Sequence, residues 1–341
     1  MQNVELSTEI APRADARSKA PVFVLGCPRS GTTWLYHMLL SAGDFAVYRA
    51  ESQVFNLLEP RFGGLSQAAN RRKLLAAWQD SELFRRTGLD RNDVSEEVMA
   101  KCRNGGDFLR IVMEAMAQRQ GVRRWADCTP EHLLYLDRIK RTIPDALVIH
   151  IIRDGRDVAL SLEKQAWIRP FAWDRRKTLE VAALYWDWIV RKGCKDGRTL
   201  GPDYVEVRFE DLVLDPRKVL ENLGGFVGQE LNYDKIERVG IGSVSQPNSS
   251  FSAEMKEGKF SPVCRWKTTL SAAQLERLEV LLGETLREFG YSLHGSGDQF
   301  SSRGPLGRMR LLYQSYFDTK LLLKKRAPFG KMLVSRDLPR F

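Results

Sequence analysis

The sequence is poor in cysteine and has no long apolar segment. Its five cysteines are widely spaced, and no Cys-X-X-Cys pair occurs. An odd number of isolated cysteines argues against a disulfide framework and a zinc site, and fits a reducing cytosol. No run of about 18 apolar residues exists, which argues against a membrane span. Residues 1–19 lack the apolar core of a signal peptide, so we expect a cytoplasmic protein with a disordered segment at residues 1–19.

The sequence has fewer acidic residues than basic residues. The 341 residues carry 53 Lys and Arg against 43 Asp and Glu, a formal net charge of +10. Such a balance favours anionic partners, such as nucleotides, sulfated or phosphorylated molecules and acidic lipid. Residues 301–341 alone hold ten Lys or Arg and two Asp. The length suits one large α/β domain, which we place at residues 20–292, followed by a basic, helical C-terminal extension at residues 293–341.

A phosphate-binding loop is present without its usual lysine. PVFVLG at residues 21–26 is typical of a buried strand, and residues 30–41 have helical spacing. Between them, LGCPRSGTT follows the pattern GXXXXGK[ST], except that Thr32 replaces the lysine. Nucleoside triphosphatases use that lysine on the β- and γ-phosphates. The remaining backbone N–H groups and hydroxyls therefore suit a single 5′-phosphate, and Arg29 is placed to touch whatever group that phosphate carries.

Two further apolar runs predict strands, at residues 146–152 and 204–208, and helical patterns separate them. This alternation predicts a mostly parallel sheet with helices on both faces. Each of the three strands ends in a polar or glycine-rich stretch, namely GCPRSG, RDGRD and FEDL. Because ligands of such sheets bind at the carboxyl ends of the strands, we expect these stretches to meet at one site.

RDGRDVALS forms a second candidate anion site. It places Arg153 at a strand end and Ser161 about two helical turns later. An arginine and a hydroxyl near a helix N-terminus suit a phosphate, although such a stretch alone is more often a solvated turn of Arg–Asp pairs. Two such sites on neighbouring strand ends suit a nucleotide with two separated phosphates.

PRSGTTW, RDGRDVALS, RFEDLVLDP and the late RWKTTLS, in this order, resemble the sulfotransferases that use 3′-phosphoadenosine-5′-phosphosulfate (PAPS). The resemblance covers about residues 21–290. It implies a three-layer α/β fold, a mostly parallel sheet flanked by helices, related to the P-loop nucleotide kinases. It also implies transfer of a sulfuryl group to a hydroxyl or amine, without a metal ion.

The resemblance assigns roles to individual residues. Arg29 matches the loop cation on the phosphosulfate, Trp34 matches an aromatic that stacks on adenine, and Arg153 and Ser161 match ligands of the 3′-phosphate. Phe209 stands where many members have a tyrosine, which removes a hydroxyl contact to adenine. The full set of matching positions is Pro28, Arg29, Ser30, Gly31, Thr32, Thr33, Trp34, Arg153, Ser161, Phe209, Lys256, Gly258, Arg265 and Lys267.

The transfer also needs a base that takes the acceptor proton, and two residues are candidates. Glu51 follows Ala46–Arg49, which we expect to be a short strand pointing at the same rim, and some members of the family use a glutamate close to this spacing. His132 follows Thr129-Pro130 at the start of a predicted helix, and other members use a histidine. We favour Glu51. We expect the remaining histidines in these segments, His37 and His150, to be structural.

Three points stay open from the sequence. The enzymatic alternative is a nucleotide or metabolite kinase of the same broad fold, and the alternative of another class is a non-catalytic nucleotide-binding protein at a membrane surface. Residues 305–326 mix leucines, aromatics and cations, so they form either a helix on an anionic membrane or, as we favour, a helix docked on the protein or a second subunit. The acceptor is not identified, oligomerisation stays open, and we expect no nucleic-acid partner.

Overall fold

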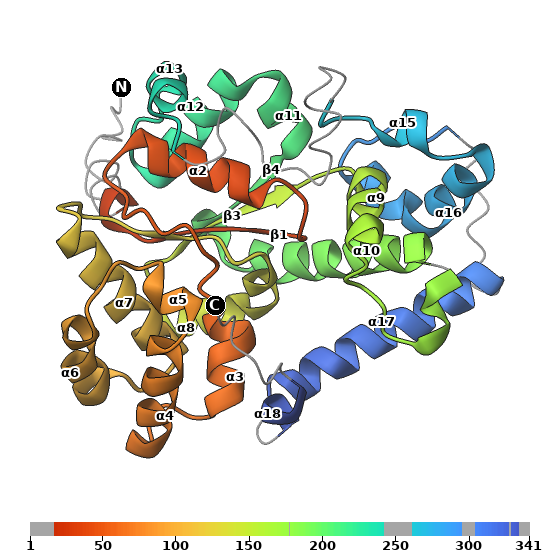
Figure 1. Ribbon diagram of the computed structural model, residues 1–341. Helices are drawn as coiled ribbons and strands as arrows, with labels where there is room; N and C mark the ends of the chain where they lie inside the picture. The colour runs from red at the N-terminus through yellow and green to blue at the C-terminus, as the bar shows by residue number, and fades with distance from the viewer. Residues whose placement is uncertain (1–16, 177, 242–260, 295–303, 327–328, 334–341) are drawn as a thin grey trace, which may run out of the picture.

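The computed structural model describes residues 17–176, 178–241, 261–294, 304–326 and 329–333. Its centre is a sheet of parallel strands in the order β2-β1-β3-β4 (Figure 1). The strands are β1 (Val22–Gly26), β2 (Ala126–Asp127), β3 (Leu147–Ile152) and β4 (Tyr204–Arg208). All residues of β1 and β3 are buried, as expected for parallel strands covered on both faces. The predicted parallel sheet and its three principal strands are confirmed.

Successive residues of β1 point into two different cores. Val22 and Val24 pack in one apolar cluster, whereas Phe23 and Leu25 pack in the other. Helices therefore lie on both faces of the sheet, which gives the predicted three layers (Figure 1). One layer is α2 (Thr32–Ala42), α11 (Phe209–Leu214), α12 (Pro216–Val227) and α13 (Tyr233–Val239); the other includes α7 (Gly105–Arg119), α8 (Leu136–Thr142) and α10 (Thr178–Arg198).

A group of short helices follows α2 and packs below the sheet in Figure 1. The predicted helical character of residues 51–120 is confirmed. Its elements are the π-helical turn η1 (Val54–Leu58), α3 (Glu59–Phe62), α4 (Ala68–Gln79), α5 (Glu82–Arg85) and α6 (Arg91–Lys101), followed by α7.

Two predicted elements differ from the structure. Ala46–Arg49 is not a strand: Phe45 forms a single parallel bridge with Arg124, and the side-chain amide of Gln120 bonds both backbone groups of Val47, so no ladder continues. The helix after Thr129 begins as the 3₁₀ turn η2 (Pro130–Tyr135) and becomes α-helical only in α8.

The remaining elements are helices and helical turns outside the sheet. They are α9 (Gly155–Gln165), η3 (Ala172–Arg176), η4 (Gly201–Asp203), α15 (Trp266–Thr269), α16 (Ala272–Glu288), α17 (Pro305–Lys324) and α18 (Phe329–Leu333). Arg17, inside the segment predicted to be disordered, donates to the backbone carbonyls of Phe226 and Pro202.

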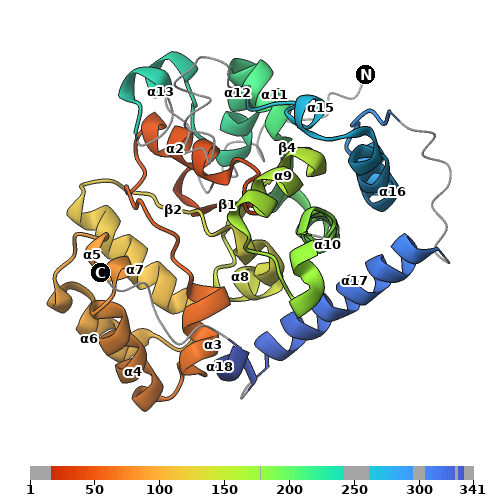
Figure 2. The same cartoon turned by 45° about the vertical axis from the view of Figure 1, so that its right-hand side comes forward.

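The basic helix α17 packs on its own chain. It runs beside α10 in Figure 2 and leads to α18, which contacts α3. Its buried side chains include Tyr313 and Phe317. Trp188 of α10 donates from Nε1 to Asp318 at 3.0 Å. None of the described helices is long and apolar enough to cross a membrane.

Candidate active site

The phosphate-binding loop connects β1 to α2 and is tightly constrained. A Cβ at Gly26 would lie 2.5 Å from the carbonyl oxygen of Ile151 in β3. Gly31, at the helix N-cap, has a φ of 95°, and a Cβ there would lie 2.3 Å from Phe209. Arg29 also has a positive φ, 74°. The loop therefore needs glycine at two places, where a neighbouring strand and an aromatic ring approach the backbone.

The loop and the RDGRD motif lie in direct contact, as predicted. Arg29 Nε donates to Ser161 Oγ of α9 at 3.0 Å, and Arg153 Nη1 donates to the carbonyl oxygen of Arg29 at 3.1 Å. Burial, and then the positive charge of Arg153, lower the pKa of Arg29. Two arginines held this close to one another suit a ligand with high negative charge.

Buried polar atoms at this junction lack protein partners. Within the described part of the chain, neither Ser30 Oγ nor Arg153 Nε has a hydrogen-bond partner, although Ser30 is fully buried and Arg153 is 8% exposed. Buried polar atoms are normally hydrogen-bonded. Ser30 and Arg153 therefore fit a site whose remaining hydrogen bonds go to a ligand.

Aromatic rings adjoin the two arginines. The rings of Trp34 and Phe209 meet edge to face, with centroids 5.7 Å apart. The guanidinium of Arg153 lies over the Phe209 ring, 4.8 Å from its centroid. Phe209 begins α11, directly after β4, so all three strand ends named from the sequence contribute to one site.

The rest of the RDGRD motif holds the site together. Asp154 caps α9 by accepting from the backbone N–H of Arg156 at 2.9 Å. The buried Arg156 forms ion pairs with Asp154 and Glu279 at 2.8 and 2.7 Å. Its guanidinium lies 3.7 Å from the ring centroid of Trp266. These contacts fix the strand end that carries Arg153.

The late RWK motif returns to the same site. Asp157 Oδ1 accepts from the backbone N–H of Trp266 at 2.9 Å, and the carbonyl of Pro262 accepts from Arg153 at 2.6 Å. Arg265 and Lys267 flank Trp266 and so lie beside the RDGRD motif. The predicted ligands Lys256 and Gly258 lie outside the described residues.

Glu51 has the properties of a base that works near neutral pH. Its side chain is exposed to solvent, and it lines an open cavity of about 420 Å³ together with Leu57 and Arg86. Partial loss of hydration beside the surrounding protein raises the pKa of Glu51 to about 7, and the negative charges of Asp127 and Glu131 contribute further. A base is most effective when its pKa lies near the working pH.

Both ring nitrogens of His132 are engaged inside the protein. Nδ1 lies 2.9 Å from Asp127 Oδ2, and Nε2 accepts from the backbone N–H of Phe55 at 3.2 Å. The residue is fully buried. This arrangement ties η2 to η1, and it leaves neither nitrogen for an acceptor.

Two acidic residues at this site were not singled out from the sequence. Burial alone would raise the pKa of Asp127, but the adjoining His132 and hydrogen bonds from Ser52 and Thr129 lower it, so it stays charged. Glu131, one residue before His132, contributes to the raised pKa of Glu51. The sequence signal was the pair of carboxylates in ADCTPEH, just before His132, the rival candidate base.

The other expected structural residues are also placed. His150 is buried in β3, where its Nδ1 lies 2.7 Å from the Tyr204 hydroxyl, and burial lowers the pKa of His150 to about 4. His37 lies on the buried side of α2. No group of three or more His, Cys, Asp or Glu side chains that could hold a metal ion occurs among the described residues.

Comparisons with known proteins agree with this geometry. The chain matches the family model described as "Sulfotransferase family" over residues 21–233. No curated protein sequence matches it. The solved sulfotransferase domain from the Synechococcus PCC 7002 olefin synthase is similar at 21% identity and a TM-score of 0.53, over 80% of this chain and 96% of that chain. The sulfotransferase domain from the curacin biosynthetic pathway is similar at 16% identity and a TM-score of 0.50, over 80% of this chain and 98% of that chain. Both likenesses support the fold.

Proposed function

The chain belongs to the sulfotransferase family, and we propose that it takes its sulfuryl group from PAPS. The observation that carries this proposal is the junction of two anion sites, where Arg29 bonds Ser161 and Arg153 bonds the backbone of Arg29. A donor with a 5′-phosphosulfate and a separate 3′-phosphate matches such a pair. A nucleoside triphosphate does not, because Thr32 stands in place of the loop lysine.

The residues present fit this donor. The 5′ side would be held by loop N–H groups at the N-terminus of α2 and by the hydroxyls of Ser30, Thr32 and Thr33. The 3′ side would be held by Arg153 and Ser161, and Trp34 and Phe209 offer ring surface for the adenine. Pro28, Gly31, Arg265, Lys267, Lys256 and Gly258 remain predicted parts of this site.

PAPS would supply the sulfuryl group, and the protein would supply charge and a base. Arg29 is positioned to stabilise the negative charge that collects on the phosphate oxygen when the S–O bond breaks. Glu51 takes the proton of the acceptor hydroxyl as that oxygen bonds to sulfur. The products are the sulfated acceptor and adenosine 3′,5′-bisphosphate. His132 positions the neighbouring segment rather than acting as the base.

The surroundings of the enzyme belong to the same proposal. We expect a cytoplasmic enzyme that needs no metal ion and whose acceptor carries a hydroxyl or amine. Contact with an anionic membrane stays a prediction. The buried aromatic face of α17 would not contribute to membrane contact. The apolar side chains that α17 exposes to solvent are Leu311, Leu312 and Leu322. Oligomerisation likewise stays open.

Ligand binding and transfer test the proposal together. Adenosine 3′,5′-bisphosphate without Mg²⁺ should raise the Tm, because a ligand at 100 times its Kd stabilises by about 2.7 kcal/mol. ATP with Mg²⁺ should have little effect. Arg153→Ala should lose the shift, whereas Arg308→Gln, a surface change on α17, should keep it. An equal response to ATP with Mg²⁺, with no transfer of ³⁵S-sulfate from labelled PAPS to any acceptor in a panel, would overturn the proposal in favour of a kinase or a non-catalytic binder.

A further inference from the structure

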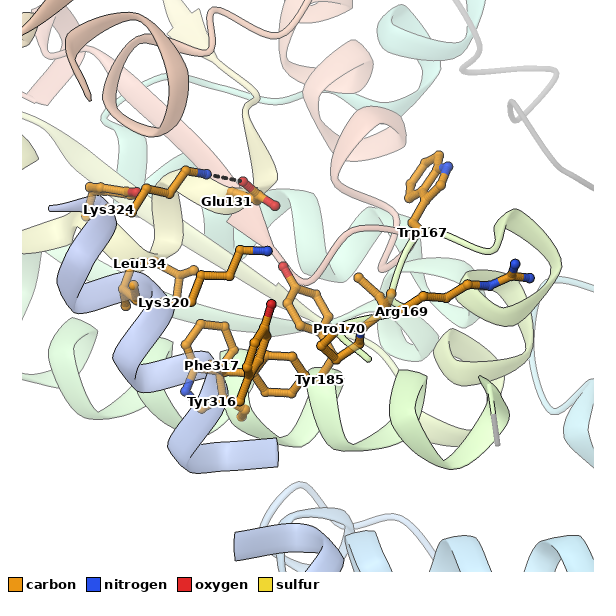
Figure 3. Close-up of a pocket in the computed structure, with 14 residues that line it drawn as sticks. Glu131, Leu134, Trp167, Arg169, Pro170, Tyr185, Tyr316, Phe317, Lys320 and Lys324 are labelled. Carbon is orange, nitrogen blue, oxygen red and sulfur yellow. Dashed lines mark ion pairs between the residues drawn. The ribbon is translucent and has the colours of Figure 1, made fainter. Parts of the chain in front are cut away.

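A second cavity lies between α10, η2 and the C-terminal helix α17 (Figure 3). Its volume is about 240 Å³, and its walls include the rings of Tyr135, Tyr185, Tyr316 and Phe317. A cavity of roughly 150 Å³ lined by apolar side chains accommodates benzene. The cavity therefore has room for one aromatic ring with a short chain attached.

This cavity is connected to the proposed base by a chain of polar contacts. Gln53 Nε2 donates to Glu51, and Asn56 Nδ2 donates to Gln53 Oε1 at 2.6 Å. Asn56 Nδ2 also lies 3.2 Å from Glu131 Oε2. Glu131 lines the cavity and faces Lys324 of α17 at 3.8 Å. The cavity and the candidate catalytic site therefore share Glu131 as a common edge.

Glu131 also lies near the phosphate-binding loop. It belongs to η2, and η2 packs against β1, the strand that leads into the loop. A molecule seated in the cavity would thus have one end beside Glu131, the lining residue that leads through Asn56 and Gln53 to Glu51. An acceptor that enters by this end approaches Glu51 and the loop from the side of Glu131, and its hydroxyl has to reach Glu51 for proton transfer and bond formation to sulfur.

The charge of the cavity walls is positive on the side of α17. Lys320, Lys324 and Arg169 line the cavity, against the single carboxylate of Glu131. In Figure 3 the ammonium of Lys320 points toward the hydroxyl of Tyr185, whereas Arg169 extends away from the cavity. No carboxylate in the described part of the chain lies within ion-pair distance of Lys320, whose ammonium lies 5.8 Å from the ring centroid of Tyr316. Lys320 is thus a solvent-exposed cation at the aromatic rim of the cavity.

The helix that carries these lysines is firmly anchored. Arg310 of α17 forms a buried ion pair with Asp187 of α10 at 3.1 Å, and Tyr313 donates to Asp174. Asp187 also accepts from Thr285 of α16. Lys320 and Lys324 therefore project from a fixed wall rather than from a mobile tail.

We propose that this cavity binds the acceptor, and that it selects a hydroxylated molecule with an aromatic body and an anionic group that Lys320 holds. The inference rests on the proposed sulfotransferase function, and it names the class of substrate for that site. The aromatic walls hold the ring and Lys320 pairs with the carboxylate or a similar anion. The hydroxyl then lies toward Glu131 and Glu51.

Three phenols with the same skeleton test the charge preference. Calorimetric titration of the full chain, saturated with adenosine 3′,5′-bisphosphate, would measure the affinities of 3-(4-hydroxyphenyl)propionate, tyrosol and tyramine, which are anionic, neutral and cationic. An ion pair to an exposed lysine contributes at most about 1 kcal/mol, which is a roughly fivefold difference in Kd. We expect the anionic phenol to bind about two- to fivefold more tightly than tyrosol, and tyramine to bind most weakly.

Variants locate the preference in the cavity. Lys320→Met should remove it, Lys320→Arg should restore most of it, and Arg308→Gln on the same helix should leave it unchanged. Equal affinities for the three phenols, no binding of any of them, or an unaltered preference in Lys320→Met would overturn the inference. Titration of the phenols without nucleotide separates the two proposals: charge-selective binding by a protein that binds no adenosine bisphosphate would refute the PAPS proposal and leave the cavity assignment intact.

Discussion

Replacing Glu51 by glutamine tests the proposed base most directly. The substitution keeps the size of the side chain and removes its ability to take a proton. General-base catalysis contributes on the order of 10² to 10⁴ in rate, so we expect kcat to fall by that factor. Binding of adenosine 3′,5′-bisphosphate should be unchanged, because Glu51 is not among the residues proposed to hold the nucleotide.

The pKa of Glu51 gives this prediction a pH dependence. With a pKa of about 7, roughly one tenth of the enzyme carries ionised Glu51 one pH unit below that value, and roughly nine tenths one unit above it. Only the ionised form accepts a proton. The rate of wild-type enzyme should therefore rise about tenfold between pH 6 and pH 8, and the residual rate of Glu51→Gln should lack this rise.

The same pKa predicts an effect on stability with the opposite sign. The folded-state pKa of Glu51 lies above its unfolded value, so the contribution of this group to stability is full below pH 4.5 and is lost as the pH rises through 7. Glu51→Gln should therefore have a higher Tm than wild type at pH 8, and no such advantage at pH 4.

The assay combines initial rates from pH 5.5 to 9 with thermal unfolding at the two pH values. Glu97→Gln, which removes an exposed carboxylate paired with Lys101, is the matched control and should change neither readout. A Glu51→Gln enzyme with near-normal kcat, or one that retains the wild-type rise in rate with pH, would refute the assignment of Glu51 as the base.

Three further substitutions examine the surroundings of the site. Glu131→Gln removes a negative charge near Glu51, so the rise in the pH–rate profile should move to lower pH; an unmoved profile would contradict the electrostatic account. His132→Ala removes a buried side chain with two internal hydrogen bonds, so the free energy of unfolding in urea should fall by about 2–4 kcal/mol, and the rate should still rise with pH, because Glu51 is retained. Gly31→Ala places a methyl group against Phe209 at a positive φ, so the Tm and the affinity for adenosine 3′,5′-bisphosphate should both fall; wild-type values for both would show that the loop can relax.

The sequence predicted the parts of the site that are local in the chain. The loop after β1 and the turn after β3 each consist of fewer than ten consecutive residues. In such a segment a strand, a tight turn and a helix N-terminus together fix the direction of the backbone N–H groups. Parallel topology then requires the strand ends to meet. The contact between Arg29 and Ser161 follows from these two rules.

The parts that were wrong or missed depend on distant partners. Ala46–Arg49 has the composition of a strand. The side-chain amide of Gln120, and not a second strand, makes the hydrogen bonds to the backbone of Val47. The helical start at Pro130 is tightened into a 3₁₀ turn where His132 bonds the backbone of Phe55. A docked helix was favoured for residues 305–326, and α17 does pack on its own chain, but where it docks depends on Asp187, Trp188 and Asp174, more than 100 residues earlier.

The contacts of α17 show that the packed structure extends beyond the residues matched by the family model. The family match ends at residue 233, yet the buried carboxylate of Asp187 takes its partners from Thr285 and Arg310. A fragment that stops at the family boundary would leave a charged group in an apolar interior without its counter-ion, and would uncover the aromatic side of α10. Removal of one partner of a buried ion pair typically costs about 3–5 kcal/mol, a large fraction of the stability of a whole domain. Residues beyond the family match thus contribute to the stability of the matched region.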